Sequence, residues 1–294
     1  MLYGILKLYR PTQWVKNTFV FIPIFFSGQL LSNSHALFIT LLVFFAFSFA
    51  ASSIYCFNDI YDVEHDRLHP KKRLRPVASG KVSRSVAYLA MLIALMASIT
   101  VNYWAYSITG LWISMFIILF YFFMNIAYCV KLKHMAIVDV FVIAVGFVLR
   151  VIVGGAASGI AMSHWLILMT FLLALFLAFA KRRDDVIMYE STGHKARPNI
   201  NRYSLIFMDQ AIGIVASVTM VCYIMYTVSD DVVSRLGTNN FYLSSIFVLA
   251  GLIRYLQITI VDKKSGSPTK ILLSDKFIHV CLVGWILCFI CILY

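Results

Sequence analysis

Nine apolar segments divide this chain, and each is close to the length that crosses a lipid bilayer. A helix needs about 20 apolar residues to span the hydrocarbon core. Of the 294 residues, 61% are hydrophobic and only 13% are charged, whereas soluble domains carry about a quarter charged residues. The sequence therefore predicts an all-α, polytopic membrane protein with nine transmembrane helices in a single domain over residues 1–294. The segments lie near residues 17–33, 36–57, 86–102, 108–129, 138–157, 163–180, 206–228, 241–260 and 277–294.

The basic residues predict the orientation of these segments. If the N-terminus is cytoplasmic, all but three of the 25 Lys and Arg residues fall on the cytoplasmic side; the exceptions are Arg150, Arg235 and Arg254. The positive-inside rule then places the N-terminus and the long charged loops in the cytoplasm and the C-terminal Tyr294 outside. In a bacterial cell this membrane would be the inner one. A net charge of +12 can indicate a nucleic-acid partner. Nucleic-acid-binding proteins, however, carry their charge on a soluble face and do not bury most of their length in apolar runs, so we expect no such partner.

The first apolar segment follows Lys7, Arg10 and Lys16. Because no small-residue cleavage site precedes Ser34, we expect a retained span and not a signal peptide.

Four oxygen-bearing side chains, Asn58, Asp59, Asp62 and Asp66, lie where the second apolar segment ends. If the helix continues for two turns, all four fall within an arc of about 100° on one face. Carboxylates that converge in this way repel one another, and a divalent cation relieves the repulsion. Mg²⁺ prefers oxygen ligands and shares its shell with water and substrate phosphates. The sequence therefore predicts a magnesium site at Asn58, Asp59, Asp62 and Asp66.

The alternative for this cluster is a solvated helix end whose acids pair with the basic residues that follow. The same basic run also suits the non-bridging oxygens of a diphosphate, because Arg offers a planar fork and Lys a point charge. This run consists of Arg67, Lys71, Lys72, Arg73 and Arg75.

The chain contains three motifs: N-D-x-x-D-x-x-x-D over 58–66, R-P-x-x-S-G over 75–80, and R-P-x-x-W-x-K-N over 10–17. Together they resemble signatures of the UbiA-type intramembrane prenyltransferase superfamily. The insertion of His69, Pro70 and Lys71 is more similar to the branch of decaprenyl-phosphate phosphoribosyltransferases than to the quinone-making aromatic prenyltransferases. The resemblance covers the whole chain. It implies a helical bundle in which two signature loops face each other over a cytoplasmic cavity.

The resemblance also implies roles for individual residues. Asp62 and Asp66 would act in catalysis as metal ligands, and the basic residues would contact phosphate groups of the substrates. The substrate contacts implied in the first half of the chain are Lys16, Asn17, Lys71, Arg73, Arg75, Lys131 and Lys133.

The end of the sixth segment departs from the usual pattern of the superfamily. Most members have a second D-x-x-x-D there, which holds a second Mg²⁺ on an isoprenoid diphosphate. Here Asp185 and Glu190 are five residues apart, about 140° around a straight helix, so they cannot hold one ion together. Instead Lys181 and Arg182 open the cluster, which resembles the phosphoribosyltransferase branch.

A lipid monophosphate needs cationic donors more than a second metal, so this departure favours a polyprenyl phosphate as substrate. Lys181 would act in catalysis, while Arg182, Asp185 and Glu190 would contact substrate. The alternative is an ordinary positive-inside loop.

Arg150 lies about 16 Å along the fifth segment from Asp139, near the middle of the membrane. An arginine at this depth is unfavourable unless it faces the protein interior and finds a partner. We therefore expect Arg150 to contact substrate, with a structural role as the alternative.

Together these features favour the Mg²⁺-dependent transfer of a phosphoribosyl group from phosphoribosyl diphosphate to a polyprenyl phosphate, such as decaprenyl phosphate. The alternative within the superfamily is transfer of a prenyl group from a polyprenyl diphosphate to an aromatic acceptor, as in quinone biosynthesis. A membrane transporter is the alternative from another class. It predicts internal repeats, and the sequence shows none.

The orientation is testable with cysteines introduced at Ser79, Thr192 and Thr238. In intact cells an impermeant thiol reagent should label position 238 and leave positions 79 and 192 unlabelled, because the basic residues place the last two inside. Permeabilised cells serve as the control, since positions 79 and 192 should react there. Labelling of position 79 in intact cells would reverse the predicted orientation.

Overall fold

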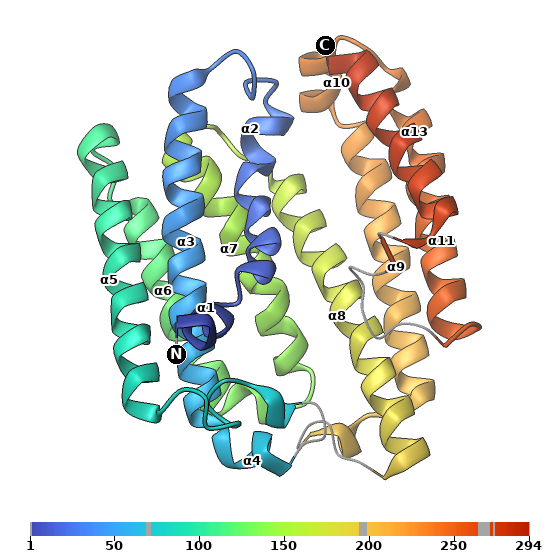
Figure 1. Ribbon diagram of the computed structural model, residues 1–294. Coiled ribbons are helices and arrows are strands. Elements are labelled where there is room, and N and C mark those ends of the chain that lie inside the picture. The colour runs from blue at the N-terminus through green and yellow to red at the C-terminus, as the bar shows by residue number, and fades with distance from the viewer. Residues whose placement is uncertain (1, 69–71, 194–198, 264–270, 273, 294) are drawn as a thin grey trace. The chain divides into compact units, whose positions relative to one another are not determined.

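The computed structural model describes residues 2–68, 72–193, 199–263, 271–272 and 274–293, and their regular secondary structure is helical throughout (Figure 1). Seven helical segments are long and apolar enough to cross a membrane, and they coincide with the second to eighth predicted segments. The all-α, multi-pass part of the predicted fold class is therefore confirmed. The seven are α3 (Ser34–Tyr61), α5 (Arg84–Thr109), α6 (Ile113–Val130), α7 (Val138–Ser158), α8 (His164–Thr192), α9 (Leu205–Thr227), and α11 (Ser245–Ile260) preceded by η5 (Asn240–Ser244).

The first and last predicted segments are not among these seven helices. Residues of the first form the 3₁₀ helix η1 (Pro11–Phe21) and the short helix α2 (Ile22–Phe26), followed by turns that include Gly28 at a φ of 73°. Because a 3₁₀ helix rises about 2.0 Å per residue, η1 and α2 together extend about 30 Å. The last segment forms α13 (Lys276–Leu293). The total of nine transmembrane helices remains a prediction.

Short helices complete the described chain. They are α1 (Leu2–Tyr9), α4 (Val63–Leu68), η2 (Lys72–Leu74), η3 (Leu132–His134), η4 (Ile200–Arg202) and α10 (Asp230–Leu236).

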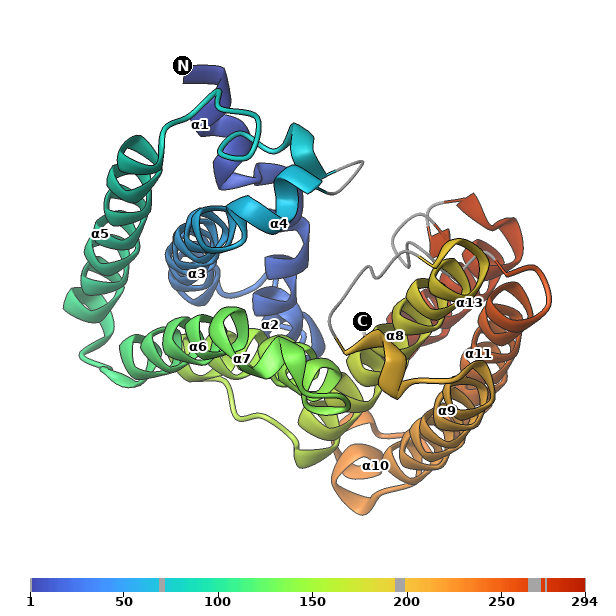
Figure 2. The ribbon, with the colours of Figure 1, turned by 90° about the horizontal axis from the view of Figure 1, so that it is seen from below.

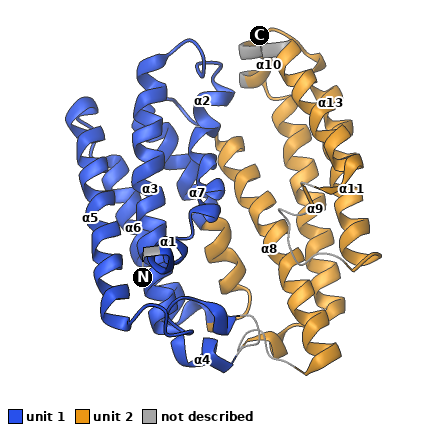
Figure 3. Ribbon diagram, in the orientation of Figure 1, with its two compact units in different colours: residues 1–133, 146–162 blue, residues 134–145, 163–294 orange. Residues whose placement is uncertain are grey.

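The described residues form two compact units (Figure 3). Unit 1 comprises residues 1–133 and 146–162, and in it α3 packs against α5, α6, η1 and α1. Unit 2 comprises residues 134–145 and 163–294, and there α9 packs against α8 and α11, which in turn packs against α13 (Figure 2). Helix α7 passes from unit 2 into unit 1 at Gly146. The single domain over the whole chain remains a prediction.

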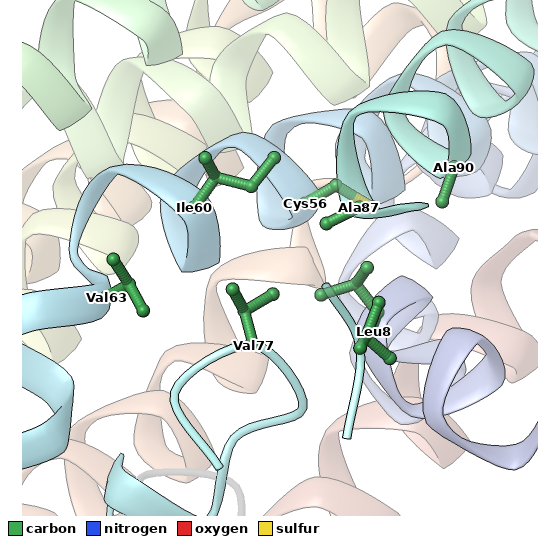
Figure 4. Packing of buried hydrophobic residues seen from close by; sticks show 8 residues of the cluster. Leu8, Cys56, Ile60, Val63, Val77, Ala87 and Ala90 are labelled. Atoms are coloured by element: carbon green, nitrogen blue, oxygen red, sulfur yellow. The ribbon is translucent and has the colours of Figure 1, made fainter. Parts of the chain in front are cut away.

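A small apolar core in unit 1 fixes the loop over residues 75–82 beneath the end of α3 (Figure 4). Val77 is buried among Cys56, Ile60 and Leu8. The backbone of the loop closes on itself, because Val82 N donates to Pro76 O at 3.0 Å. Burial of such side chains stabilises by about 1.5–3 kcal/mol each, so this core determines where the loop presents its arginine.

Serines on α3 fix the N-terminal segment of unit 1. Trp14 Nε1 donates to Ser52 Oγ at 3.0 Å, and Ser52 Oγ donates to the carbonyl oxygen of Tyr9 at 2.9 Å. One turn earlier, Asn17 Nδ2 donates to Ser48 Oγ at 3.0 Å. Small hydroxyl side chains at i and i+4 thus hold α1 and η1 along α3.

The close approach of α7 to η1 is testable at Gly154. A Cβ there would lie 2.0 Å from the carbonyl oxygen of Val20, and this neighbour is backbone that cannot rotate away. We expect Gly154→Ala to lower the free energy of unfolding by about 1–3 kcal/mol through overpacking, measured as thermal unfolding in detergent. The matched control is Gly213→Ala in α9, where a Cβ meets nothing within 4 Å. Gly213→Ala should be neutral or slightly stabilising. Equal stability of the two variants would contradict the packing.

Candidate active site

The end of α3 carries the first acidic cluster in unit 1. With 28 residues α3 is about 42 Å long, more than the 30 Å of a hydrocarbon core, so its polar last turns extend past the apolar part. Asp62 caps the helix, and α4 continues after it. Asp62 N donates to Asn58 O at 3.0 Å and Asp66 N to Asp62 O at 2.8 Å. The backbone therefore keeps the predicted helical spacing of the four side chains.

Two arginines neutralise the buried half of this cluster. Asp59 and Asp66 are 1% and 3% exposed. Arg75 Nη1 lies 2.6 Å from Asp66 Oδ2 and 3.4 Å from Asp59 Oδ1, and Arg10 forms an ion pair with the same Asp59 Oδ1. The second oxygen, Asp59 Oδ2, is buried and accepts no hydrogen bond from the described residues.

The other half of the cluster faces the end of α6. Lys133 Nζ donates to Asp62 Oδ1 at 2.5 Å and lies 5.2 Å from the ring centre of Tyr61. Cys129 Sγ donates to Asn58 Oδ1 at 3.4 Å. The four predicted metal ligands thus separate into two pairs, and each carboxylate has a basic partner. The alternative of a solvated helix end predicts Arg75 as a partner of these acids, but it does not predict Arg10 or Lys133.

The oxygen atoms of this cluster fit a Mg²⁺ ion that takes its other ligands from water and from substrate phosphates. Among the described residues no three His, Cys, Asp or Glu side chains converge as a ready-made metal site. Mg²⁺, however, is usually held by one or two carboxylates together with water and substrate phosphates. Asp59 Oδ2, which has no hydrogen-bond partner among the described residues, and the half-buried Asp62 offer such oxygens. The predicted metal ligands remain a prediction that this chemistry supports.

The remaining cations predicted to contact substrate in unit 1 have different surroundings. Arg73 and Lys131 are exposed, and Lys16 is half-buried. Lys71 lies outside the described residues.

Arg150 is buried in unit 1 and is held by neutral groups. Its Nε donates to Asn17 Oδ1 at 2.8 Å and its Nη2 to the Tyr121 hydroxyl at 3.0 Å, while Nη1 donates to the Gly146 carbonyl at 2.6 Å. The guanidinium also lies 5.0 Å from the ring centre of Phe47. Three hydrogen bonds and an aromatic face compensate its desolvation. The structure thus gives Arg150 and Asn17 a shared structural role, and their predicted contacts with substrate remain untested.

The second cluster lies in unit 2 at the end of α8, which with 29 residues also exceeds the bilayer core. Arg182 is buried, and its Nε donates to Asp139 Oδ2 at 2.7 Å and its Nη1 to Asp185 Oδ2 at 2.9 Å. Lys181 and Glu190 are exposed. Because α8 is one helix through Thr192, Asp185 and Glu190 point to different sides of it, as the sequence predicts.

Arg183, which follows Arg182 in α8, holds three helices of unit 2 together. It is buried, and its Nε donates to Asp209 Oδ1 at 2.5 Å and its Nη1 to the carbonyl oxygen of Thr259 at 2.8 Å. One side chain thus joins α8 to α9 and α11.

Tyr203 is a member of the second cluster that is not predicted from the sequence. Its hydroxyl donates to Asp139 Oδ1 at 2.7 Å and accepts from Ile137 N at 2.6 Å. Ile137 has a φ of 70°, a strained value for a β-branched residue. Burial, together with the bond to Asp139, raises the pKa of Tyr203, so the phenol keeps its proton at neutral pH. No sequence signal marks this residue, because its partners are 64 and 66 positions away.

Arg10 is a further residue whose place beside Asp59 is not predicted from the sequence. Arg10 belongs to the R-P-x-x-W-x-K-N motif, and this motif is the sequence signal that could have marked it as a site residue.

A bundle of long apolar helices that carries buried carboxylate–arginine pairs at helix ends is an integral membrane fold in which the ionisable groups mark a candidate functional site. The model of the UbiA prenyltransferase family matches residues 19–290, and the chain belongs to this family. It is accordingly a transferase in a multi-pass membrane fold.

Similar proteins extend over nearly the whole chain. The decaprenyl-phosphate phosphoribosyltransferase of Corynebacterium glutamicum is 31% identical over 293 residues, which cover 99% of this chain and 87% of the relative. The protein of the same name from Mycolicibacterium smegmatis is 32% identical, with coverages of 96% and 90%. The structure of a UbiA homologue from Archaeoglobus fulgidus bound to GPP and Mg²⁺ matches 99% of both chains with a TM-score of 0.70 at 18% identity. At 18% identity, the match to the Archaeoglobus fulgidus structure shows that the two proteins share a fold.

Proposed function

We propose that this transferase moves a phosphoribosyl group from phosphoribosyl diphosphate to a polyprenyl phosphate and releases diphosphate. The observation that carries the proposal is the nearly full-length similarity to two proteins named decaprenyl-phosphate phosphoribosyltransferase. The sequence at the end of α8 supports it, because Lys181 and Arg182 stand where a second metal-binding D-x-x-x-D is usual in the superfamily. In this proposal both clusters lie on the cytoplasmic side of the membrane.

The end of α3 would bind the diphosphate of the donor. Mg²⁺, held by Asn58, Asp59, Asp62 and Asp66, would supply Lewis-acid stabilisation of the negative charge that develops on the leaving diphosphate. Arg73 and Arg75 would bind phosphate oxygens, because guanidinium groups match them with paired hydrogen bonds. Lys71, Lys131 and Lys133 would add positive charge around the same group.

In the transfer itself, the bond between C1 of ribose and the diphosphate oxygen breaks, and the diphosphate leaves with the electron pair. C1 gains oxocarbenium character and forms its new bond with an oxygen of the lipid phosphate. That oxygen is already anionic, so the attack needs no general base. Orientation of the two phosphorylated substrates is then the main contribution of the protein.

Lys181 would bind the lipid phosphate from the end of α8. It is exposed, whereas the adjacent Arg182 is buried between Asp139 and Asp185 and holds the helix end in place. The isoprenoid tail would lie along apolar helix surface in the bilayer.

This assignment predicts different effects for Lys181→Ala and Arg73→Ala. With purified protein in detergent, Lys181→Ala should raise the KM for polyprenyl phosphate at least several-fold and leave the KM for phosphoribosyl diphosphate nearly unchanged, because one charged contact to the lipid phosphate is lost. Arg73→Ala should show the reverse. Arg73 is preferred to Arg75, since Arg75 also neutralises two buried carboxylates.

Lys276→Ala is the matched control, because Lys276 is an exposed lysine at the start of α13. It should change neither KM. An unchanged lipid KM in Lys181→Ala would contradict its role. Prenylation of an aromatic acid from a polyprenyl diphosphate, with no phosphoribosyl donor present, would replace the proposed reaction with the alternative one.

A further inference from the structure

Arg10 has a backbone conformation that other residues rarely adopt. Its φ and ψ are 49° and 57°, in the left-handed region, and Pro11 follows it. A non-glycine residue is strained there, and a following proline restricts its backbone further. Such strain persists only where the surrounding structure enforces it, and it concentrates at functional sites.

The neighbours of Arg10 enforce this conformation. The residue before it is held through its carbonyl oxygen by Ser52, and Trp14 donates to the same serine. The guanidinium lies 4.9 Å from the ring centre of Tyr55 and pairs with Asp59. The N-terminal segment therefore delivers one cation to one buried carboxylate.

The charges at this place balance without a metal ion. Asp59 and Asp66 carry two negative charges, and Arg10 and Arg75 carry two positive ones. A bare Mg²⁺ would leave an excess of two positive charges in a buried site, which is unfavourable. A metal ion that arrives with a diphosphate brings its own negative charge.

The two partners also differ in their freedom to move. The side chain of Arg10 is 25% exposed, whereas that of Asp59 is 1% exposed. Asp59 Oδ2 is buried without a hydrogen-bond partner among the described residues, so the carboxylate has an open ligand position. The arginine can leave, and the carboxylate stays.

We propose that Arg10 is an exchangeable cation that holds Asp59 in the free enzyme and moves to the diphosphate when a metal–diphosphate complex binds. The inference rests on the proposed function only in that a metal-bound diphosphate is the ligand at the end of α3. Because metal and arginine compete for Asp59, the metal alone binds weakly. Metal and diphosphate strengthen each other's binding, and this coupling is reciprocal.

The test is a titration of the purified protein with Mn²⁺, followed by electron paramagnetic resonance, with and without inorganic diphosphate. In the wild-type protein diphosphate should tighten Mn²⁺ binding at least tenfold. In Arg10→Gln, Mn²⁺ should bind at least tenfold more tightly than in wild type when diphosphate is absent, since the competing charge-assisted bond is gone. Diphosphate should then tighten Mn²⁺ binding to Arg10→Gln by a smaller factor than it tightens binding to the wild-type protein.

Two further variants separate competition from general damage. Arg84→Gln removes the same charge from an exposed pair with Glu64 in the same unit and should leave Mn²⁺ binding at the wild-type value. Arg10→Lys keeps a cation and should stay closer to wild type than to Arg10→Gln.

Wild-type protein that binds Mn²⁺ equally with and without diphosphate would overturn the proposal, and so would Arg10→Gln with unchanged metal affinity. If Arg10→Gln does not fold, the wild-type measurement can still overturn the proposal, and Arg10→Lys remains to test the part of Arg10. Because the titration contains neither a phosphoribosyl donor nor a lipid acceptor, its result is independent of which group the enzyme transfers. Metal–diphosphate coupling without phosphoribosyl transfer would refute the proposed function and keep this inference.

Discussion

The pairing of two buried carboxylates with two arginines is the constraint on which the organisation of unit 1 depends. An unpaired buried carboxylate is strongly unfavourable, so Asp59 and Asp66 at the end of α3 require cations that reach them. One comes from the N-terminal segment as Arg10 and one from the loop after α4 as Arg75. Breaking one pair typically lowers stability by about 3–5 kcal/mol, because a charge remains buried.

Two pieces of ordinary packing make these pairs possible. Val77 inserts into the apolar core at the end of α3 and thereby fixes the loop that carries Arg75. Ser48 and Ser52 hold η1 and α1 along α3, so that Arg10 meets Asp59. The polar site therefore depends on apolar and neutral contacts that carry no chemistry of their own. In unit 2 a buried arginine is likewise paired with carboxylates, since Asp139 and Asp185 hold Arg182 at the end of α8.

The sequence predicts the local features of this molecule well and the distant pairings poorly. Hydropathy identifies the seven long helices, because the length and composition of a span are local properties. The helical backbone at Asn58, Asp62 and Asp66 is predicted for the same reason, whereas the separation of this cluster into two pairs is not. The pairing of Arg10 with Asp59 joins residues 49 positions apart, and that of Arg182 with Asp139 joins residues 43 apart. Such pairs depend on packing, which one sequence does not reveal. Pro11 lies at the start of η1 and Pro23 at the start of α2. Hydropathy alone does not use these prolines, so it predicts one continuous span where the structure has two short helices.

The central claim is that the end of α3 binds a diphosphate together with a metal ion. Calorimetric titration of the purified protein with inorganic diphosphate tests it most directly, with wild type compared with Asp62→Asn, which keeps the size of the side chain and removes its charge. Wild-type protein should bind diphosphate in excess Mg²⁺ and lose most of this affinity in EDTA, and Asp62→Asn should bind weakly in both. Equal affinity in Mg²⁺ and in EDTA, or an unchanged affinity in Asp62→Asn, would contradict the account.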